Sequence, residues 1–342
     1  MSKKILVTGG VGYIGSHTVV ELLQQNFEVF IVDNLSNSHI SVLQGIEKIT
    51  GKKPHFTKLD LVDKNATEQY FTKHHDIDAV IHFAALKSVN ESVAEPLKYY
   101  QNNLGSLINL LSNMISLKLN YLVFSSSCTI YGQPDKLPVN EEAPKKTPLS
   151  PYGNTKQIAE EIILDTINSS DFLNAISLRY FNPIGSHPSS LIGELPLGIP
   201  NNLVPYVTQT AAGIRQQLKV YGNDYNTSDG TCIRDYINVV DLAKAHVVAV
   251  NRLLENKIKN NFEVFNLGTG KGHSVLDVIN AFEKVSRKKL NYIFANRRPG
   301  DVEQVWADAT KANKVLGWKA ETGLEETMLS AWNWEKRYRG IQ

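Results

Sequence analysis

The sequence predicts an α/β protein with a doubly wound parallel sheet, followed by a smaller α/β region toward the carboxyl end. Short apolar runs alternate with helix-like stretches in the first half of the chain, which is the pattern of parallel strands joined by helical crossovers. Two of these runs, residues 28–32 and 121–124, are almost continuously apolar, as strands covered on both faces are. A glycine-rich turn joins the first apolar run to the first helix-like stretch.

The individual elements follow from the same patterns. In the first half we expect strands at residues 4–8, 28–32, 79–83, 121–125 and 175–179, and helices at residues 14–25 and 102–117. Residues 182–205 are rich in proline and polar turn residues, and a loop of that length usually has a function or covers a site. Beyond it we expect helices at residues 237–254 and 274–286 and a strand at 264–267. Ser274 is the expected N-cap of the last helix, with Asp277 three residues later.

Composition excludes several classes of protein. The 342 residues include 36 Lys and Arg against 34 Asp and Glu, a net charge of +2, so the chain lacks the basic excess of a nucleic-acid binder. Cys128 and Cys232 are far apart and form no CxxC motif, which argues against a disulfide framework or a structural zinc site. The apolar run at residues 5–8 is too short for a signal peptide, and no window approaches the ~18 apolar residues of a membrane span. We therefore expect a reduced, cytoplasmic, globular protein.

Gly9, Gly12 and Gly15 form a G-x-x-G-x-x-G turn between the first expected strand and the first expected helix. About 0.1 such patterns are expected by chance at this glycine content, and a tight turn without a ligand has the same spacing. In context, the turn would let a diphosphate approach the backbone at a helix N-terminus, where free N–H groups and the dipole favour anions. Asp33 ends the second strand and can accept both ribose hydroxyls while repelling a 2′-phosphate, so NAD is favoured over NADP; a turn-forming Asp is the alternative. Asp60 could meet the adenine or form a turn.

Tyr152 and Lys156 are four residues apart in a helical stretch that begins with Pro151. About one such pair is expected by chance, and an ordinary surface pair is the alternative. One helical turn would place both side chains on the same face. The pKa of a tyrosine is near 10, and an adjacent ammonium together with a positive nicotinamide ring would lower it enough to give a usable base.

Three serines, ending at Ser127, lie at the end of the strand expected at 121–125, the sheet edge where such folds bind ligands. A hydroxyl there could share a proton path between a substrate and Tyr152, and a polar loop is the alternative. Cys128 reads as a small packed side chain rather than a nucleophile.

These motifs resemble the extended short-chain dehydrogenase/reductase family. The similarity includes the glycine turn from Thr8 to Gly15, the serines with Tyr131-Gly, Tyr152-x-x-x-Lys156 and Arg179-Tyr-Phe-Asn-Pro183. Finer motifs, in order along residues 3–334, are similar to the UDP-glucose 4-epimerase branch of that family: His82-Phe-Ala-Ala-Leu-Lys87, Glu91-Ser, Ile199-Pro-Asn-Asn-Leu203, Gly222-Asn-Asp-Tyr225, Arg234-Asp-Tyr236, Arg298-x-Gly-Asp301 and Trp306-Ala-Asp-Ala309.

The resemblance implies a role for each matching residue. The catalytic residues would be Ser127, Tyr152 and Lys156. NAD would be bound by Gly9, Gly12, Tyr13, Ile14, Gly15, Asp33, Asn34, Asp60, Leu61, Phe83, Ala84, Lys87, Asn102, Tyr152, Lys156 and Tyr180. The UDP-hexose would be bound by Lys87, Ser127, Tyr152, Asn182, Asn202, Leu203, Tyr221, Arg234, Arg298, Asp301 and Val305. Two arginines can fork onto a diphosphate where a lysine offers only a point charge.

The same resemblance implies a domain division and a reaction. Residues 1–180 would form a Rossmann domain that binds NAD, to which segments near 237–267 return, and residues 181–342 would mainly bind the UDP-sugar. The reaction would be 4-epimerisation between UDP-glucose and UDP-galactose through a 4-keto intermediate, in a homodimer that associates through helices such as 102–117. Alternatives are a sugar-nucleotide 4,6-dehydratase and a non-catalytic NAD-binding regulator.

Val305 is the position where this chain departs from part of the family. In members restricted to unacetylated sugars a tyrosine stands in this place, seven residues after Arg298. Valine leaves more room beside the C2 substituent, so we expect UDP-GlcNAc and UDP-GalNAc also to be substrates, unless neighbouring loops fill the space.

Overall fold

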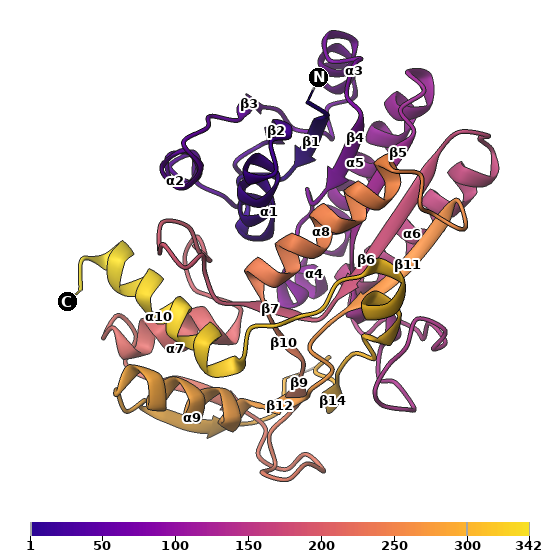
Figure 1. Cartoon of the computed structure of the whole chain (residues 1–342). Helices are drawn as coiled ribbons and strands as arrows, with labels where there is room; N and C mark the ends of the chain where they lie inside the picture. Colours follow the sequence, from indigo (N-terminus) through magenta and orange to yellow (C-terminus); the bar gives the residue numbers. More distant parts are fainter. Residues whose placement is uncertain (1, 299, 342) are drawn as a thin grey trace.

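The computed structural model describes residues 2–298 and 300–341, and its largest feature is a seven-stranded sheet (Figure 1). The strands stand in the order β11-β6-β5-β4-β1-β2-β3, and all neighbours are parallel. The expected strands of the first half are β1 (Lys4–Thr8), β2 (Glu28–Asp33), β4 (Ala79–His82), β5 (Tyr121–Ser127) and β6 (Asn174–Tyr180). The predicted doubly wound α/β fold is confirmed.

Two further strands extend the sheet at its edges. β3 (His55–Lys58) has a single apolar residue and mostly exposed side chains, so no apolar run marks it in the sequence. β11 (Phe262–Leu267) includes the strand expected at 264–267 and pairs with β6. A segment from the second half of the chain therefore completes the sheet of the first half.

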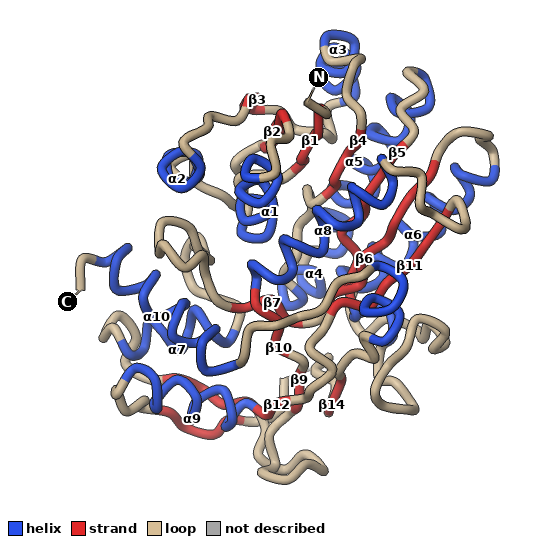
Figure 2. The backbone as a smooth tube through the Cα atoms, viewed as in Figure 1, coloured by secondary structure: helices blue, strands red, loops and turns tan. Residues whose placement is uncertain are grey.

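Helices cover both faces of the sheet in separate layers (Figure 2). One face carries α1 (Tyr13–Gln24), α2 (Val42–Thr50) and α8 (Val239–Leu254), and the other carries α3 (Lys64–Lys73), α5 (Pro96–Ser116) and α6 (Pro151–Asn168). Successive side chains of a strand point to opposite faces, so Ile5 packs in the first core and Leu6 in the second. This explains why the central strands are apolar throughout.

Some helix boundaries differ from those expected. α5 begins six residues before the predicted start, because Pro96 fits the first turn of a helix. The helix expected from residue 237 begins only at Val239: Ile237 belongs to the short strand β10 (Tyr236–Asn238), and the Asn238 side chain caps α8 by accepting from the Val240 N–H at 2.8 Å. The expectation for Ser274 is confirmed, since Ser274 and Asp277 form a full capping box on α9 (Val275–Ser286).

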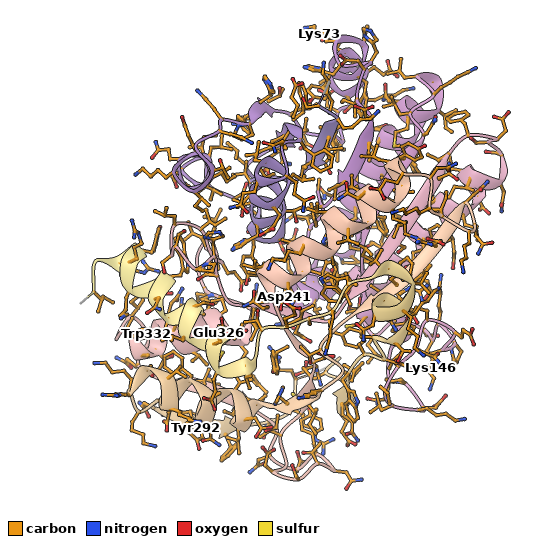
Figure 3. The ribbon with its side chains drawn as sticks, viewed as in Figure 1. Lys73, Lys146, Asp241, Tyr292, Glu326 and Trp332 are labelled. Carbon is orange, nitrogen blue, oxygen red and sulfur yellow. The ribbon has the colours of Figure 1, made fainter. Side chains whose placement is uncertain are left out.

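A smaller lobe lies beyond the carboxyl ends of the sheet strands (Figure 1). It contains α7 (Leu203–Ala211), β8 (Leu218–Tyr221), α9, β13 (Tyr292–Ala295) and α10 (Leu324–Arg339), around a core of its own. Trp332 on α10 belongs to that core (Figure 3), and its ring meets the Phe282 ring edge to face with centroids 5.6 Å apart. Asp241, at the start of α8, joins the two parts because its carboxylate accepts from the Glu321 and Thr322 N–H groups at 2.9 and 2.8 Å (Figure 3).

Short strands connect the lobe to the sheet. β7 (Asn182–Ile184) follows β6 directly and pairs with β10, while β9 (Ile233–Arg234) lies between β12 (His273–Ser274) and β14 (Gln304–Val305). Two single turns, η1 (Cys128–Tyr131) after β5 and η2 (Ala312–Leu316), and the short helix α4 (Val89–Ala94) complete the fold. Among the residues described, no helix is long and apolar enough to cross a membrane.

Candidate active site

In the strand order, β2 and β3 lie on one side of β1 and β4 lies on the other. The connections therefore run in opposite directions from β1, and in a doubly wound sheet a crevice forms at the carboxyl ends of the strands at this point. Ligands of doubly wound sheets bind at such a switch point. Gly9, Asp33 and Phe83 lie at this edge, at the ends of β1, β2 and β4, and Ser127 and Tyr180 end β5 and β6. The structure thus brings together residues that are up to 171 positions apart (180 − 9) along the chain.

Helix α6 positions Tyr152 and Lys156. It begins with Pro151, and the hydroxyl of Ser150 caps it by accepting from the Gly153 N–H at 3.2 Å. Tyr152 and Lys156 are only 9% and 5% exposed, so the surface-pair alternative is wrong. The Lys156 ammonium donates to the Ser125 carbonyl at 2.7 Å. The helix therefore delivers both side chains to the end of β5.

Burial sets the protonation of these two groups. Loss of hydration and the neighbouring Tyr180 raise the pKa of Tyr152 well above its usual value, and the Ser127 hydroxyl opposes the rise. Burial lowers the pKa of Lys156 to about 8, and the Glu160 carboxylate opposes that change. The protein alone therefore favours a neutral phenol, and a phenolate requires added positive charge beside Tyr152, which a bound NAD⁺ would bring.

Hydroxyl groups lie near the Tyr152 side chain, among them those of Ser127 and Tyr180. The Ser127 hydroxyl accepts from the N–H and the hydroxyl of Thr129, at 3.2 and 3.0 Å. The Ser125 hydroxyl and the Tyr180 phenol are 2.5 Å apart, and Ser127 is the register partner of Tyr180. Cys128 is half-buried against an apolar cluster, and burial raises the pKa of its thiol to about 12, so it is a packed side chain as predicted.

The glycine turn has no room for side chains. A Cβ on Gly15 would lie 2.3 Å from the Gly9 carbonyl oxygen, and one on Gly9 would lie 2.8 Å from the Ala84 nitrogen. Gly9 also has φ +70°, a left-handed conformation that favours glycine. Its carbonyl accepts from the Gly12 N–H at 3.0 Å, which closes the turn directly before α1. This open helix N-terminus fits the diphosphate of a dinucleotide.

The adenosine side of the crevice carries polar groups. Asp33 accepts from the Val11 N–H at 3.1 Å, from the Leu35 N–H at 2.8 Å and from the Ser38 hydroxyl at 2.9 Å. An open hollow of ≈380 Å³ lies next to it, lined by Asn34, Ser36, Lys58, Leu59 and Asp60. Asn34 donates to Asp60 at 3.1 Å, which places the two residues expected near adenosine together. Leu61, also expected there, is buried.

The segment after β4 is fixed by a residue that the sequence analysis did not select. Asn103 accepts from the Leu86 N–H at 2.8 Å and donates to the Leu86 carbonyl and the Thr155 hydroxyl, at 3.0 and 3.1 Å. It also accepts from Asn102 at 3.0 Å, so the expected NAD residue Asn102 is linked through Asn103 to Leu86, the residue before Lys87. Its position on a predicted helix gave no signal for these contacts.

Glu194 is a second residue that the sequence analysis missed. Its carboxylate accepts from Lys87 at 3.1 Å and from Asn202 at 2.6 Å, and so joins an expected NAD residue to an expected UDP-sugar residue. Tyr13 donates to the Gly185 carbonyl at 2.6 Å, which ties α1 to the same loop. Only the unusual length of the 182–205 loop indicated that it covers a site.

The expected diphosphate residues gather on the lobe. Asp301 accepts from Arg298 at 2.9 and 3.4 Å, and its Oδ1 lies 4.0 Å from Nη2 of Arg234. The Arg298 guanidinium lies 4.8 Å from the centroid of the Tyr221 ring.

Val305 is the register partner of Arg234 and packs with Phe181 and Cys128, next to Ser127. Asn182 pairs with Tyr236, and Leu203 begins α7.

Comparisons with known proteins agree with this geometry. A family model described as GDP-mannose 4,6 dehydratase matches residues 6–330. UDP-glucose 4-epimerase of Bacillus subtilis is 50% identical over 331 residues, which cover 97% of this chain and 96% of that protein. The chain belongs to the UDP-glucose 4-epimerase family.

Solved structures of the UDP-glucose 4-epimerase family superpose closely. The crystal structure of UDP-glucose 4-epimerase from Bifidobacterium longum in complex with NAD⁺ and UDP has a TM-score of 0.95 at 45% identity, covering 99% of this chain and 100% of that one. The UDP-Glc/GlcNAc 4-epimerase of Campylobacter jejuni has a TM-score of 0.84 at 36% identity, covering 98% and 100%. The resemblance predicted from the motifs is confirmed.

The dehydratase alternative finds no support at the end of β5. A sugar-nucleotide 4,6-dehydratase would need an acidic pair directly after the serines, whereas Cys128 and Thr129 stand there. The Thr129 hydroxyl donates to Ser127 and is therefore committed to holding that serine.

Proposed function

We propose that this protein is an NAD-dependent UDP-glucose 4-epimerase, which interconverts UDP-glucose and UDP-galactose through a 4-keto sugar. The observation that carries the proposal is the meeting of three groups at one sheet edge. Tyr152, Lys156 and Ser127 converge between the glycine turn on one side and the arginine pair on the other. A regulator that only binds NAD would need no buried tyrosine and lysine there.

NAD fits the crevice because the turn before α1 has an open helix N-terminus and Asp33 lies beside it. The residues that would hold it are those expected from the sequence, among them Asp33, Asn34, Lys87, Asn102 and Tyr180. When bound, NAD supplies the oxidising and reducing power of the reaction and is regenerated in each turnover.

The chain's own residues move the proton and hold the substrate. Tyr152 takes the proton of the sugar 4′-hydroxyl, directly or through Ser127, and returns it at the end. Lys156 contributes positive charge on the same helix face. Arg234 and Arg298, oriented by Asp301, bind the diphosphate. Because these arginines hold the UDP part, the sugar can turn about its link to the diphosphate and present its other face.

We also infer activity on UDP-GlcNAc and UDP-GalNAc. Val305 is short, and its neighbours Phe181 and Cys128 belong to the cluster beside Ser127. A short side chain at this position would leave room beside the sugar for an N-acetyl group at C2. Direct assay with UDP-GalNAc tests this substrate, and production of UDP-GlcNAc is the expected result.

A homodimer and a cytoplasmic location complete the proposal. Ile108 on α5 and Leu164 on α6 are 48% and 41% exposed, and α5 packs against α6, so their outer faces offer an apolar surface for a second copy. Cys128 and Cys232 are free thiols, as a reducing compartment leaves them. Light scattering of the purified protein measures the dimer.

The decisive experiment adds UDP-galactose to the purified holoenzyme. We expect UDP-glucose as product and a transient rise in NADH absorbance. Tyr152→Phe should lower kcat by about 10²–10⁴-fold, because the proton acceptor is lost. Tyr70→Phe, which removes a hydroxyl from a buried tyrosine on α3, should leave kcat unchanged. Near-normal epimerisation by Tyr152→Phe, or a dehydrated sugar as product, contradicts the proposal.

A further inference from the structure

A buried carboxylate with no role in the reaction lies beneath the catalytic helix. The side chain of Glu160 on α6 is 0% exposed. It accepts hydrogen bonds from the hydroxyls of Ser126 and Ser177 at 2.8 and 2.9 Å. Arg179 binds it with Nε and Nη2 at 2.8 and 2.6 Å, and Lys145 reaches it at 3.0 Å. Four side chains from β5, β6 and the loop before α6 therefore converge on one carboxylate.

Glu160 follows Lys156 by one helical turn, so both point to the same buried face. Burial raises the pKa of the Tyr152 and Tyr180 phenols and lowers that of the His82 imidazole to about 3, so before NAD⁺ binds these neighbours add no charge beside the lysine. The Ser125 carbonyl that receives the ammonium supplies only a dipole. Glu160 thus provides the negative charge that favours a protonated Lys156.

The cluster around Glu160 has a simple charge balance. Glu160 carries −1, while Arg179 and Lys145 each carry +1, so the three groups sum to +1. Without the carboxylate, the positive charges of Arg179 and Lys145 would remain uncompensated in the cluster one helical turn from Lys156. Like charges at short range disfavour the charged form of each other.

We propose that Glu160 is a positioning residue for Lys156: by offsetting part of the positive charge of Arg179 and Lys145 it keeps the lysine protonated and bonded to the Ser125 carbonyl at the working pH. The proposal rests on the role given to Lys156 in the proposed function. Arg179 makes the arrangement rigid, because its Nη1 donates to the Tyr131 hydroxyl at 2.9 Å, and Tyr131 donates to Asn266 on β11 at 2.8 Å.

Charge substitutions in the cluster separate this role from a structural one. Glu160→Gln raises the cluster charge from +1 to +2, Lys145→Gln lowers it to 0, and the double variant restores +1. Lys145 is 31% exposed, so its substitution leaves the core intact. Neither residue touches the expected substrate or cofactor atoms.

Two measurements report the protonation state of Lys156. The first is the pH profile of kcat with UDP-galactose, whose alkaline limb reports loss of the Lys156 proton. The second is the ¹³Cε chemical shift of Lys156 in lysine-labelled holoenzyme, titrated by NMR and assigned with Lys156→Met. The NMR titration needs no turnover, so a wild type that fails to epimerise overturns the proposed function while the titration still tests Glu160.

The expected shifts differ in sign. The pKa of Lys156 and the alkaline limb should move down by about one pH unit in Glu160→Gln, move up by about half a unit in Lys145→Gln, and return to the wild-type value in the double variant. Unchanged titration in both single variants, or shifts in the same direction, overturns the proposal. If Glu160→Gln does not fold, Lys145→Gln decides alone: an upward shift supports the proposal and an unchanged pKa overturns it.

Discussion

The two sides of the crevice are built differently. On the sheet side the expected NAD site is made largely of backbone: the Gly9 turn, the N-terminus of α1 and the strand end that carries Asp33. On the lobe side the expected UDP site is made of side chains that hold one another, such as Arg298 on Asp301 and Asn202 on Glu194. A site made of backbone depends on a few positions that tolerate no substitution, whereas in a site made of side chains the binding energy comes from many weak contacts.

The largest expected effect on NAD content and stability is therefore at Gly15. In Gly15→Ala the new methyl would lie 2.3 Å from the Gly9 carbonyl oxygen, and this backbone atom cannot move without opening the turn. We expect about tenfold less NAD in the purified protein and a loss of about 1–3 kcal/mol in the free energy of unfolding. NAD released by acid and quantified by chromatography measures the first, and chemical denaturation the second.

Gly323→Ser is the matched control for this substitution. Gly323 is the N-cap of α10, a Cβ added there would have nothing within 4 Å, and serine is a favoured N-cap. This variant should keep its NAD and its stability. Full NAD content in Gly15→Ala would show that the backbone of the turn can shift to accommodate a methyl group without losing NAD binding.

The difference between the backbone site and the side-chain site also explains which parts of the fold and the site could be predicted from the sequence. Six of the seven sheet strands, the glycine turn and the Ser274 cap are local patterns, in which period, spacing and residue type are all visible within a dozen residues. The place of Tyr152 and Lys156 follows from one helical turn and the strand edge. These parts of the molecule were predicted with small errors at the element ends.

The remainder depends on contacts between distant segments. β9 and β14 pair residues about 70 positions apart, and each has only two residues, too few to show a period. Glu160 and Asn103 lie on predicted helices, but the residues that satisfy them come from other strands and loops. Sequence spacing cannot show which partner a buried polar side chain meets, so these residues were missed.

The next effect, on substrate selectivity, is expected on the lobe side, at Val305. Val305→Tyr should abolish epimerisation of UDP-GalNAc while UDP-galactose is still converted, because the ring would occupy the space beside C2. NAD content should not change, since the substitution leaves the glycine turn untouched. Parallel assays of kcat/KM on both substrates measure the selectivity.

Val305→Cys is the control for side-chain size. Cysteine behaves as a small apolar residue, so both substrates should still react. Equal activity of Val305→Tyr on the two substrates would mean that neighbouring loops, and not residue 305, set the space beside the sugar.

The smallest expected effect lies farther into the lobe, at Ser274. Its hydroxyl caps α9 by accepting from the Asp277 N–H at 3.0 Å, and it also donates to Asp229. Ser274→Ala should lower the free energy of unfolding by about 1 kcal/mol, as loss of an N-cap usually does. The exposed Ser228 in the same region provides the control, because Ser228→Ala removes a hydroxyl without removing a cap.

This cap also tests how far the lobe depends on single contacts. β12 ends at Ser274 and pairs with β9, so His273 is the register partner of Arg234. Arg234 is held from the other side by β14, and the Ala307 N–H and the Thr269 hydroxyl both donate to the neighbouring Asp235. With so many independent restraints, the KM for UDP-galactose should change less than about twofold in Ser274→Ala. A large rise in KM at normal NAD content would instead show that β12 alone positions the arginine, and that the lobe shares the sheet's dependence on single positions.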